Sequence, residues 1–298
     1  MTTYAVPELA RELADAVGDG QIVTEGERLD DYSADTYWKA LAARASGRPL
    51  GRPEVVVVPT SEEAVTGVLE VANRRGVPVV PWGGGSGSQG GAVPTEGGIV
   101  LDLRALDRIV EIDEESLSVT AEAGVNGRRL EGELNERGLM LPHYPASADL
   151  ATVGGYVAAR GSGVLSTRYG KIEDLVLSLR VVVPTGEVID TVRVPRHAVG
   201  PELTQLFVGS EGTLGVVTRA TLQLAPLPAA RRFEAVSFPS VAVGVGAVRG
   251  AIARGLRPSV VRLYDEVATR QTLAPVVGEE LEGVCTILCF EGEQAIVS

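Results

Sequence analysis

The glycine-rich stretch after residue 82 contains the residues best suited to bind a ligand. Residues 77–91 read VPVVPWGGGSGSQGG, and six of the nine residues from Gly83 to Gly91 are glycine. Because glycine lacks a Cβ, such a run can take positive φ and turn several backbone N–H groups toward one anion. The run follows an apolar strand, so it predicts a backbone cradle for the pyrophosphate of a dinucleotide such as FAD.

Two other interpretations use the same glycines. A glycine-rich loop is often only a flexible turn. Gly85, Gly87 and Gly90 also match the G-x-G-x-x-G fingerprint of NAD-binding Rossmann folds, but that fingerprint requires a helix to begin inside it. Residues 92–98 instead contain a proline and two glycines, and residues 99–103 read as a buried strand. The context therefore favours a cradle between two strands over a Rossmann site.

A strand–helix–strand unit is expected to position this loop. Residues 55–58 are a run of valines, residues 60–63 form a capping box, and apolar residues then recur at helical spacing until Gly76. The strand 77–80 follows and leads into the glycine loop. The loop is therefore expected at the carboxyl edge of a sheet, where ligands usually bind.

Two further loops of small residues, 145–155 and 209–215, follow in the chain. Alternating and helical patterns around them predict two antiparallel hairpins and three helices. In chain order we expect a hairpin (109–113 with 117–123), a helix (126–137), a short strand (139–141), a helix (156–160), a second hairpin (175–183 with 188–192), a helix (201–208) and a strand ending near residue 224.

The pattern changes after the prolines at 226 and 228. The expected elements there are a strand (233–238), a helix (241–254), the segment 257–264 with a strand-like run at 259–261, and a strand within 283–290, which suggests half of a second α/β layer. The chain stops shortly after the last of these, so we expect this domain to be incomplete.

Composition excludes several classes of function. The 298 residues are 45% hydrophobic, and 27 basic against 39 acidic side chains give a formal charge of −12, which disfavours nucleic acid as a partner. Two histidines and two cysteines are too few for a zinc site, and we expect no metal. Cys285 and Cys289 are expected as buried residues on one strand face. The N-terminus has no apolar signal segment and no run could span a bilayer, so a cytoplasmic location is expected.

The three loops together resemble those of FAD-linked oxidases of the vanillyl-alcohol oxidase and p-cresol methylhydroxylase superfamily. Four motifs are most similar to the alkyldihydroxyacetonephosphate synthase branch of that superfamily. They are HYPAS (143–147), YGKIEDL (169–175), GSEGTLGV (209–216) and RLYD (262–265).

This resemblance implies an α+β fold. It implies an FAD-binding domain of the p-cresol methylhydroxylase type with two subdomains, followed by the start of an α/β cap domain for substrate. The boundaries we expect are a helical lead-in at 1–50, the FAD-binding domain at 51–226 with its internal boundary near residue 105, and an incomplete cap at 227–298.

The resemblance also implies which residues contact FAD. The expected contacts are Pro81, Trp82, Gly83, Gly84, Gly85, Ser86, Gly87 and Ser88 on the pyrophosphate; Pro145, Ala146, Ser147, Ala148, Asp149, Leu150, Ala151, Thr152, Gly154, Gly155, Ala158, Ala159, Arg160 and Gly161 along the flavin and ribityl chain; and Glu211, Gly212, Thr213, Leu214, Gly215, Val216 and Val217 at the adenine end and ribityl chain.

We expect FAD to be bound without a covalent bond, because the pyrophosphate loop contains neither histidine nor cysteine. His143, near the second loop, is the residue that could tether the flavin, but a histidine held at a strand end by hydrogen bonds is the simpler interpretation. His197 is expected to be a solvated loop residue.

Three functions fit these features. The first is an FAD-dependent oxidoreductase that passes hydride from a small 2-hydroxy acid or similar alcohol to flavin N5. The second is a transferase like alkyldihydroxyacetonephosphate synthase, which uses FAD without net oxidation. The third is a non-catalytic FAD-binding subunit or fragment. The expected partners are a small-molecule substrate, an unidentified electron acceptor and a second copy of the chain in a homodimer.

On the substrate side, Arg262 is the expected anchor for a carboxylate or phosphate, since the synthase has an arginine at the matching position. An ion pair with Asp265 or Glu266 is an equally good interpretation. Glu173 and Asp174 are expected to cap a helix or to pair with Arg168. In the family, the histidines and tyrosine that act on substrate lie further along, so the general base is expected beyond residue 298.

Overall fold

The computed structural model describes residues 5–278 and 283–297 of the chain, which form two compact units. The first unit contains residues 1–141, 146–161 and 172–225, and the second contains residues 142–145, 162–171 and 226–298. Both units mix helices and sheets, so the fold is α+β as predicted. The predicted domain boundaries at 50, 105 and 226 remain predictions.

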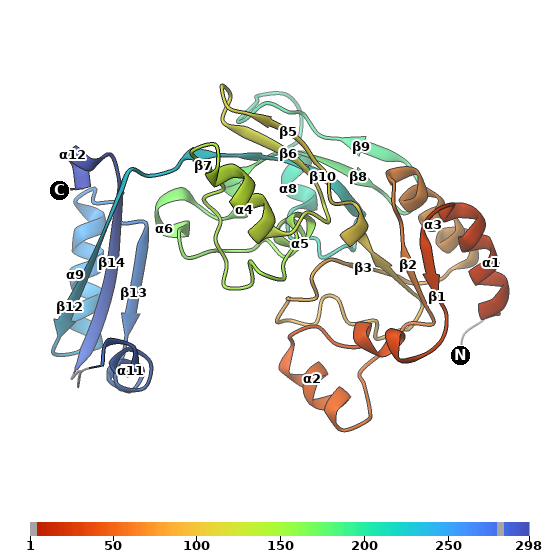
Figure 1. Cartoon of the computed structure of the whole chain (residues 1–298), viewed down its shortest axis with the longest axis horizontal. Helices are drawn as coiled ribbons and strands as arrows, with labels where there is room; N and C mark the ends of the chain where they lie inside the picture. The colour runs from red at the N-terminus through yellow and green to blue at the C-terminus, as the bar shows by residue number, and fades with distance from the viewer. Residues whose placement is uncertain (1–4, 279–282, 298) are drawn as a thin grey trace. The chain divides into compact units, whose positions relative to one another are not determined.

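A four-stranded sheet forms the N-terminal part of the first unit (Figure 1). Its order is β1 (Gln21–Val23), β2 (Val55–Val58), β4 (Ile99–Asp102) and β3 (Val79–Trp82). Strands β2, β4 and β3 are parallel, and β1 pairs with β2 in the antiparallel direction. The predicted strand–helix–strand unit is confirmed, with β4 inserted between its two strands.

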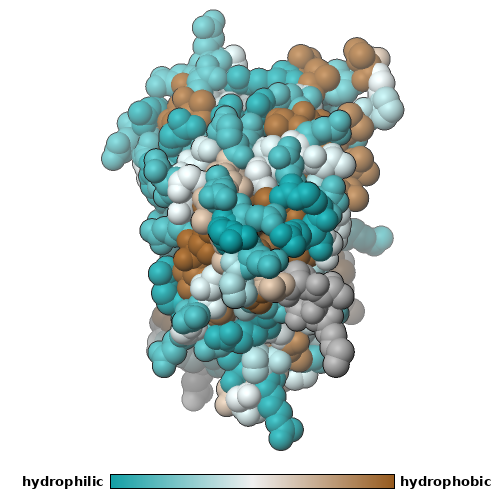
Figure 2. All heavy atoms as spheres, turned by 90° about the vertical axis from the view of Figure 1, so that its right-hand side faces the viewer, coloured by the Kyte–Doolittle hydropathy of each residue, from teal (hydrophilic) through white to brown (hydrophobic). Residues whose placement is uncertain are grey.

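Helix α3 (Glu62–Arg75) forms where the capping box and Gly76 predicted it. Ser61 accepts the N–H of Ala64 at the N-terminus, and Gly76 ends the helix in the left-handed conformation. The helix packs against α1 (Val6–Val17), and the two amphipathic helices bury their apolar sides together with the sheet. The surface on that side is mostly hydrophilic, with apolar residues only in small patches (Figure 2). The segment between β1 and β2 adds a 3₁₀ helix (Glu27–Tyr32) and α2 (Trp38–Ala45).

A five-stranded antiparallel sheet forms the rest of the first unit. Its order is β5-β6-β10-β8-β9, and a short 3₁₀ helix (Leu103–Ala105) connects the first sheet to it. Both predicted hairpins are confirmed as β5–β6 and β8–β9. The elements are β5 (Ile109–Asp113), β6 (Ser118–Glu122), α4 (Gly127–Asn135), β7 (Leu139–Met140), α5 (Val153–Ala158), α7 (Ile172–Leu175), β8 (Val176–Val182), β9 (Val188–Asp190), α8 (Leu203–Phe207), β10 (Val216–Gln223) and β11 (Ala225–Pro226).

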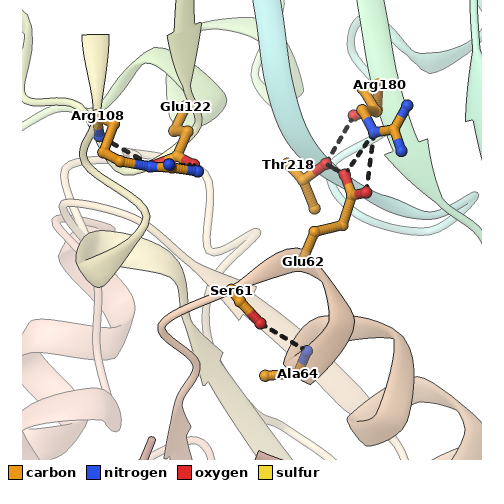
Figure 3. A network of polar contacts seen from close by, with 7 residues as sticks. All are labelled: Ser61, Glu62, Ala64, Arg108, Glu122, Arg180 and Thr218. Carbon is orange, nitrogen blue, oxygen red and sulfur yellow. Dashed lines mark hydrogen bonds and ion pairs between the residues drawn. The ribbon is translucent and has the colours of Figure 1, made fainter. Parts of the chain in front are cut away.

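A polar network joins α3 to the five-stranded sheet (Figure 3). The Arg180 Nε on β8 lies 2.8 and 2.9 Å from the two carboxylate oxygens of Glu62, and the Thr218 hydroxyl on β10 donates to Glu62 at 2.6 Å. Glu62 is thus held by two strands of the second sheet from the first turn of a helix that packs on the first sheet. Both sheets of this unit are therefore fixed relative to each other.

The second unit contains a three-stranded antiparallel sheet of order β12-β14-β13. Cys285 and Cys289 are buried and free on β14, as predicted. The elements are α6 (Ser166–Tyr169), β12 (Ala230–Phe238), α9 (Val241–Ala253), β13 (Val260–Tyr264), α10 (Glu266–Ala268), a π-helical turn (Thr269–Leu273), α11 (Ala274–Val277), β14 (Val284–Gly292) and α12 (Gln294–Val297). Across residues 5–278 and 283–297, no helix is long and apolar enough to cross a membrane.

Candidate functional site

The glycine loop leaves the carboxyl end of β3, and residues 83–98 contain no helix before β4 begins. The Rossmann interpretation is therefore excluded. Gly85 takes a φ of 62°, which favours glycine at this turn, and a Cβ there would overlap the ring of Trp82. The Trp82 ring itself is buried in the core next to Tyr32, at a centroid distance of 5.1 Å. The Trp82 ring is therefore not available for direct contact with a ligand, and only the backbone of Trp82 could bind one.

The second loop packs directly against the first. A Cβ at Gly84 would overlap the carbonyl oxygen of Leu150, and a Cβ at Gly83 would overlap the hydroxyl of Thr152. That hydroxyl accepts the N–H of Gly155 and so caps α5. The two glycines are required because the backbones of the two loops approach within contact distance.

The third loop touches the first loop and the helix that follows the second. A Cβ at Gly212 would lie 2.8 Å from the ring of Pro81, and a Cβ at Gly91 would lie 2.5 Å from the carboxylate of Glu211. The N–H of Glu211 donates to the carbonyl of Ala158 at 3.1 Å. The second and third loops, which are far apart in the sequence, therefore both contact the first loop or β3 within the first unit, and the third loop also contacts α5, the helix that follows the second.

The amides of the glycine loop are the unusual feature of this site. Among the described residues, none accepts a hydrogen bond from the backbone N–H groups of residues 83–91. The carbonyls of Ser86 and Gly87, in contrast, accept from Thr36, whose hydroxyl lies 3.0 and 2.8 Å away and whose N–H lies 2.9 Å from Gly87. Backbone N–H groups need a partner, so this loop has acceptors engaged and donors open to water or to an anion.

A pocket of about 440 Å³ opens between the third loop, α3 and β3. Five of the predicted cofactor residues line it, with α3 and the start of β3 on its other side. The five are Pro81, Gly212, Thr213, Gly215 and Val216.

The other predicted cofactor residues differ in how deeply they are buried. Ala148, Ala151, Thr152, Gly154 and Val217 are buried in the first unit, so only their backbone or a small part of their side chains could reach a ligand. Pro145 belongs to the second unit. The remaining members of the second and third loops are at least partly exposed: Ala146, Ser147, Asp149, Leu150, Gly155, Ala158, Ala159, Arg160, Gly161, Glu211 and Leu214.

Two non-glycine residues of these loops adopt positive φ. Arg160 has a φ of 48° and Glu211 a φ of 51°, and such backbone strain tends to occur at functional sites. Arg160 is held by the carbonyl of Val208 at 2.8 Å and by the carboxylate of Glu173 at 3.3 Å. Glu173 thus pairs with Arg160, a residue inside the predicted site, and the capping of a helix or pairing with Arg168 expected of Glu173 and Asp174 stays a prediction.

Partial burial of the Glu211 carboxyl, followed by the negative charge of Asp35, raises the pKa of Glu211. Two carboxylates thus share the surroundings of the glycine loop. Pattern reasoning missed the segment of Asp35 and Thr36, because no spacing rule relates residue 36 to residue 87.

The histidines behave differently from each other. His143 is buried, and that burial lowers its pKa to about 4, so the imidazole is neutral at pH 7. The His197 side chain is only 10% exposed and lies 3.4 Å from the carboxylate of Glu202. The expectation of a solvated His197 is wrong, because the loop folds back over the ring.

Arg262 lies exposed on β13 in the second unit. The Asp265 side chain accepts the N–H of Ala268 and caps α10, and an ion pair of Arg262 with Asp265 or Glu266 stays the alternative. Arg168 donates to the backbone carbonyl of Glu291 and stacks on Tyr169. No group of three or more potential metal ligands occurs in the part of the chain that the structure describes.

The sequence and the fold are similar to those of known proteins. Residues 53–192 match a family described as an FAD binding domain. The chain is 37% identical to alkyldihydroxyacetonephosphate synthase of Trypanosoma brucei brucei over 274 residues, which cover 89% of this chain and 44% of that protein. It is 35% identical to the mitochondrial D-lactate dehydrogenase (cytochrome) of Arabidopsis thaliana over 249 residues, which cover 83% of this chain and 43% of that protein.

A solved structure of p-cresol methylhydroxylase matches 98% of this chain and 61% of its own, with a TM-score of 0.78 and 22% identity, which is evidence of a shared fold. The chain thus spans less than half the length of the two curated relatives named above.

Proposed function

The chain belongs to the FAD-binding oxidoreductase superfamily with the p-cresol methylhydroxylase fold, and from that premise we propose that it binds FAD at its three loops and oxidises a small 2-hydroxy acid. One observation carries the proposal: a run of nine loop residues whose amides have no acceptor among the described residues, beside two loops that contact it. Open amide donors are the chemistry that a pyrophosphate requires.

Each of the three loops is assigned to one part of FAD by the chemistry of its residues. The amides of Gly83 to Ser88 hold the pyrophosphate, and the small residues of the second loop let the backbone approach a flat ring. The third loop closes the adenine end through Gly212 and Gly215, which border the 440 Å³ pocket. When bound, FAD supplies the acceptor for hydride at flavin N5.

The binding is non-covalent in this proposal. His143 is the one histidine near the second loop, and it is buried with a lowered pKa. Its neutral ring fits a structural position. Flavin that separates from the acid-precipitated protein would support this assignment, and flavin that remains with the precipitate would contradict it.

The substrate side rests on Arg262. An exposed guanidinium can make two parallel hydrogen bonds to a carboxylate, and such charge-assisted bonds are stronger than neutral ones. A 2-hydroxy acid offers that carboxylate next to the carbon that loses hydride.

A second candidate is transfer chemistry like that of alkyldihydroxyacetonephosphate synthase, favoured by 37% identity over 274 residues to such an enzyme. A third is a flavin-binding piece without catalysis of its own, favoured by the share of the relatives that the chain spans. All three require bound flavin. Purified protein that is colourless and releases no flavin on denaturation would exclude all of them.

Anaerobic mixing with D-lactate or glycolate separates the three. Oxidation of either acid should bleach the visible absorbance of the flavin within the mixing experiment, and air should restore it. Flavin that stays oxidised across a panel of hydroxy acids, while dithionite still reduces it, would contradict the proposed oxidation. Exchange of acyl for alkyl groups without bleaching would then support the transferase.

A further inference from the structure

One buried carboxylate oxygen beside the glycine loop has no partner. Asp35 is 2% exposed, and its Oδ1 accepts the N–H of Tyr37 at 2.9 Å. Its Oδ2 accepts no hydrogen bond from any residue that the structure describes. Buried polar atoms are nearly always paired, so this oxygen requires a donor that the protein itself does not supply.

The position of this oxygen is fixed against the loop. A Cβ at Gly87 would lie 3.5 Å from Asp35 Oδ2. The next residue, Thr36, makes three hydrogen bonds to the carbonyls of Ser86 and Gly87. Asp35 is therefore held beside Gly87, in the middle of the run of open amides, although it lies outside residues 53–192, which match the FAD binding domain.

The carboxylate of Asp35 can bind only a ligand group that donates a hydrogen bond. An ionised carboxylate only accepts hydrogen bonds, so a pyrophosphate, which also only accepts, would be repelled. The nearby carboxylate of Glu211 adds to that repulsion. The sugar chains on both sides of a dinucleotide pyrophosphate carry hydroxyls, which donate. An acidic residue that binds a ribose hydroxyl beside a glycine loop is a known solution in dinucleotide-binding folds.

We propose that Asp35 belongs to the cofactor site and accepts a hydrogen bond from a sugar hydroxyl of FAD next to the pyrophosphate. This inference rests on the proposed binding of FAD to the three loops. It adds the segment of Asp35 and Thr36 to the three loops as a fourth part of the site. Thr36 binds the carbonyls of Ser86 and Gly87 and so holds them away from the anion. Asp35 accepts the hydrogen bond of the neighbouring sugar hydroxyl.

The test is Asp35→Asn, which keeps the acceptor for Tyr37 and removes the charge. Flavin-free protein is titrated in EDTA, so that no metal ion can bridge carboxylate and pyrophosphate, with FAD, ADP and FMN as separate ligands. Asp31→Asn is the matched control, because Asp31 is an exposed aspartate in the same segment. Loss of a charge-assisted hydrogen bond should weaken FAD binding about tenfold in D35N and leave D31N unchanged.

The truncated ligands identify the hydroxyl. A loss shared by FAD and ADP places it on the adenosine ribose, and a loss shared by FAD and FMN places it on the ribityl chain. Either result supports the inference. FAD affinity within twofold of the unmodified protein would overturn it. If the unmodified chain binds no FAD, the proposed function itself has failed, and that outcome is visible before any variant is made.

Thermal unfolding distinguishes a ligand contact from a structural one. Because Oδ2 is unpaired without ligand, D35N should leave the Tm of the flavin-free protein unchanged or higher, while the rise in Tm on adding FAD becomes smaller. A lower Tm without flavin together with an unchanged rise on adding FAD would mean that Asp35 serves the fold alone, and would overturn the inference.

Discussion

The glycines of the three loops differ from two glycines of α9 in the space around them. In the first unit, glycines at 83, 84 and 212 allow loops from distant parts of the chain to touch, and a Cβ on any of them would meet another loop. In the second unit, Gly246 and Gly250 lie within α9 with nothing near the position of a Cβ. The loops of the first unit are therefore specified by close contacts, whereas these two positions of α9 are not. Under the proposed function, cofactor binding should tolerate few changes at the loop glycines, while Gly246 and Gly250 can vary.

The sharpest test of this contrast places one methyl group in each unit. Gly84→Ala should force the first and second loops apart, lower the free energy of unfolding by about 3 kcal/mol or more, and abolish flavin binding. Gly246→Ala should raise the free energy of unfolding by about 0.5–1 kcal/mol, because alanine is favoured in an exposed helix. Chemical denaturation and flavin content measure both. Equal effects of the two changes would remove the distinction between the units.

In the second unit, the free energy of unfolding should fall in acid because of His143. Its pKa is about 4 when folded against 6.5 ordinarily, because burial disfavours the charged ring. A depressed pKa means that the stability it contributes is present above pH 6.5 and is lost as the pH falls toward 4, by about 3 kcal/mol in total. His143→Gln should flatten that part of the pH dependence in urea unfolding. Parallel curves for both proteins between pH 7.5 and 4 would contradict the assignment.

The network of Glu62 between the two sheets of the first unit should contribute less to the free energy of unfolding than the loop glycines. Glu62→Gln leaves Arg180 and Thr218 with a weaker acceptor and should cost about 1–2 kcal/mol. In the second unit, Glu234 pairs with Arg232 on the surface, so Glu234→Gln should cost less than about 0.5 kcal/mol. Urea titrations of the two variants provide the comparison, and a larger effect at Glu234 would reverse it.

The smallest change in stability is expected at Arg262. Its side chain is exposed, so Arg262→Ala should change the free energy of unfolding by less than about 0.5 kcal/mol and leave flavin content intact. Under the proposed function, the KM for a hydroxy acid should rise about tenfold or more, since a charge-assisted pair is lost. Loss of flavin in this variant would show that Arg262 has a structural role.

Local patterns predicted the elements well. The capping box at Ser61 and Gly76 gave the bounds of α3 to within a residue, and alternation gave both hairpins, because these signals act between neighbours in the chain. The glycine loop between two strands was also readable, since proline and glycine exclude a helix there. Family resemblance added the idea that three loops share one ligand.

Contacts between residues far apart in the chain could not be predicted from local sequence patterns. Nothing near Thr36 signals that it will bind the carbonyls of Ser86 and Gly87, and nothing near Glu173 favours Arg160 over Arg168. His197 was misjudged for the same reason, because its burial depends on how a loop returns to Glu202. These pairings depend on packing, which a pattern in one segment does not contain.

The network around Glu62 also constrains the order of events during synthesis. Its Thr218 partner lies 156 residues further along the chain, so the ribosome must produce most of the first unit before this hydrogen bond can form. Contacts of such long sequence separation slow folding. The nascent chain therefore cannot complete this network early, and under the proposed function stable capture of the cofactor follows translation of β10.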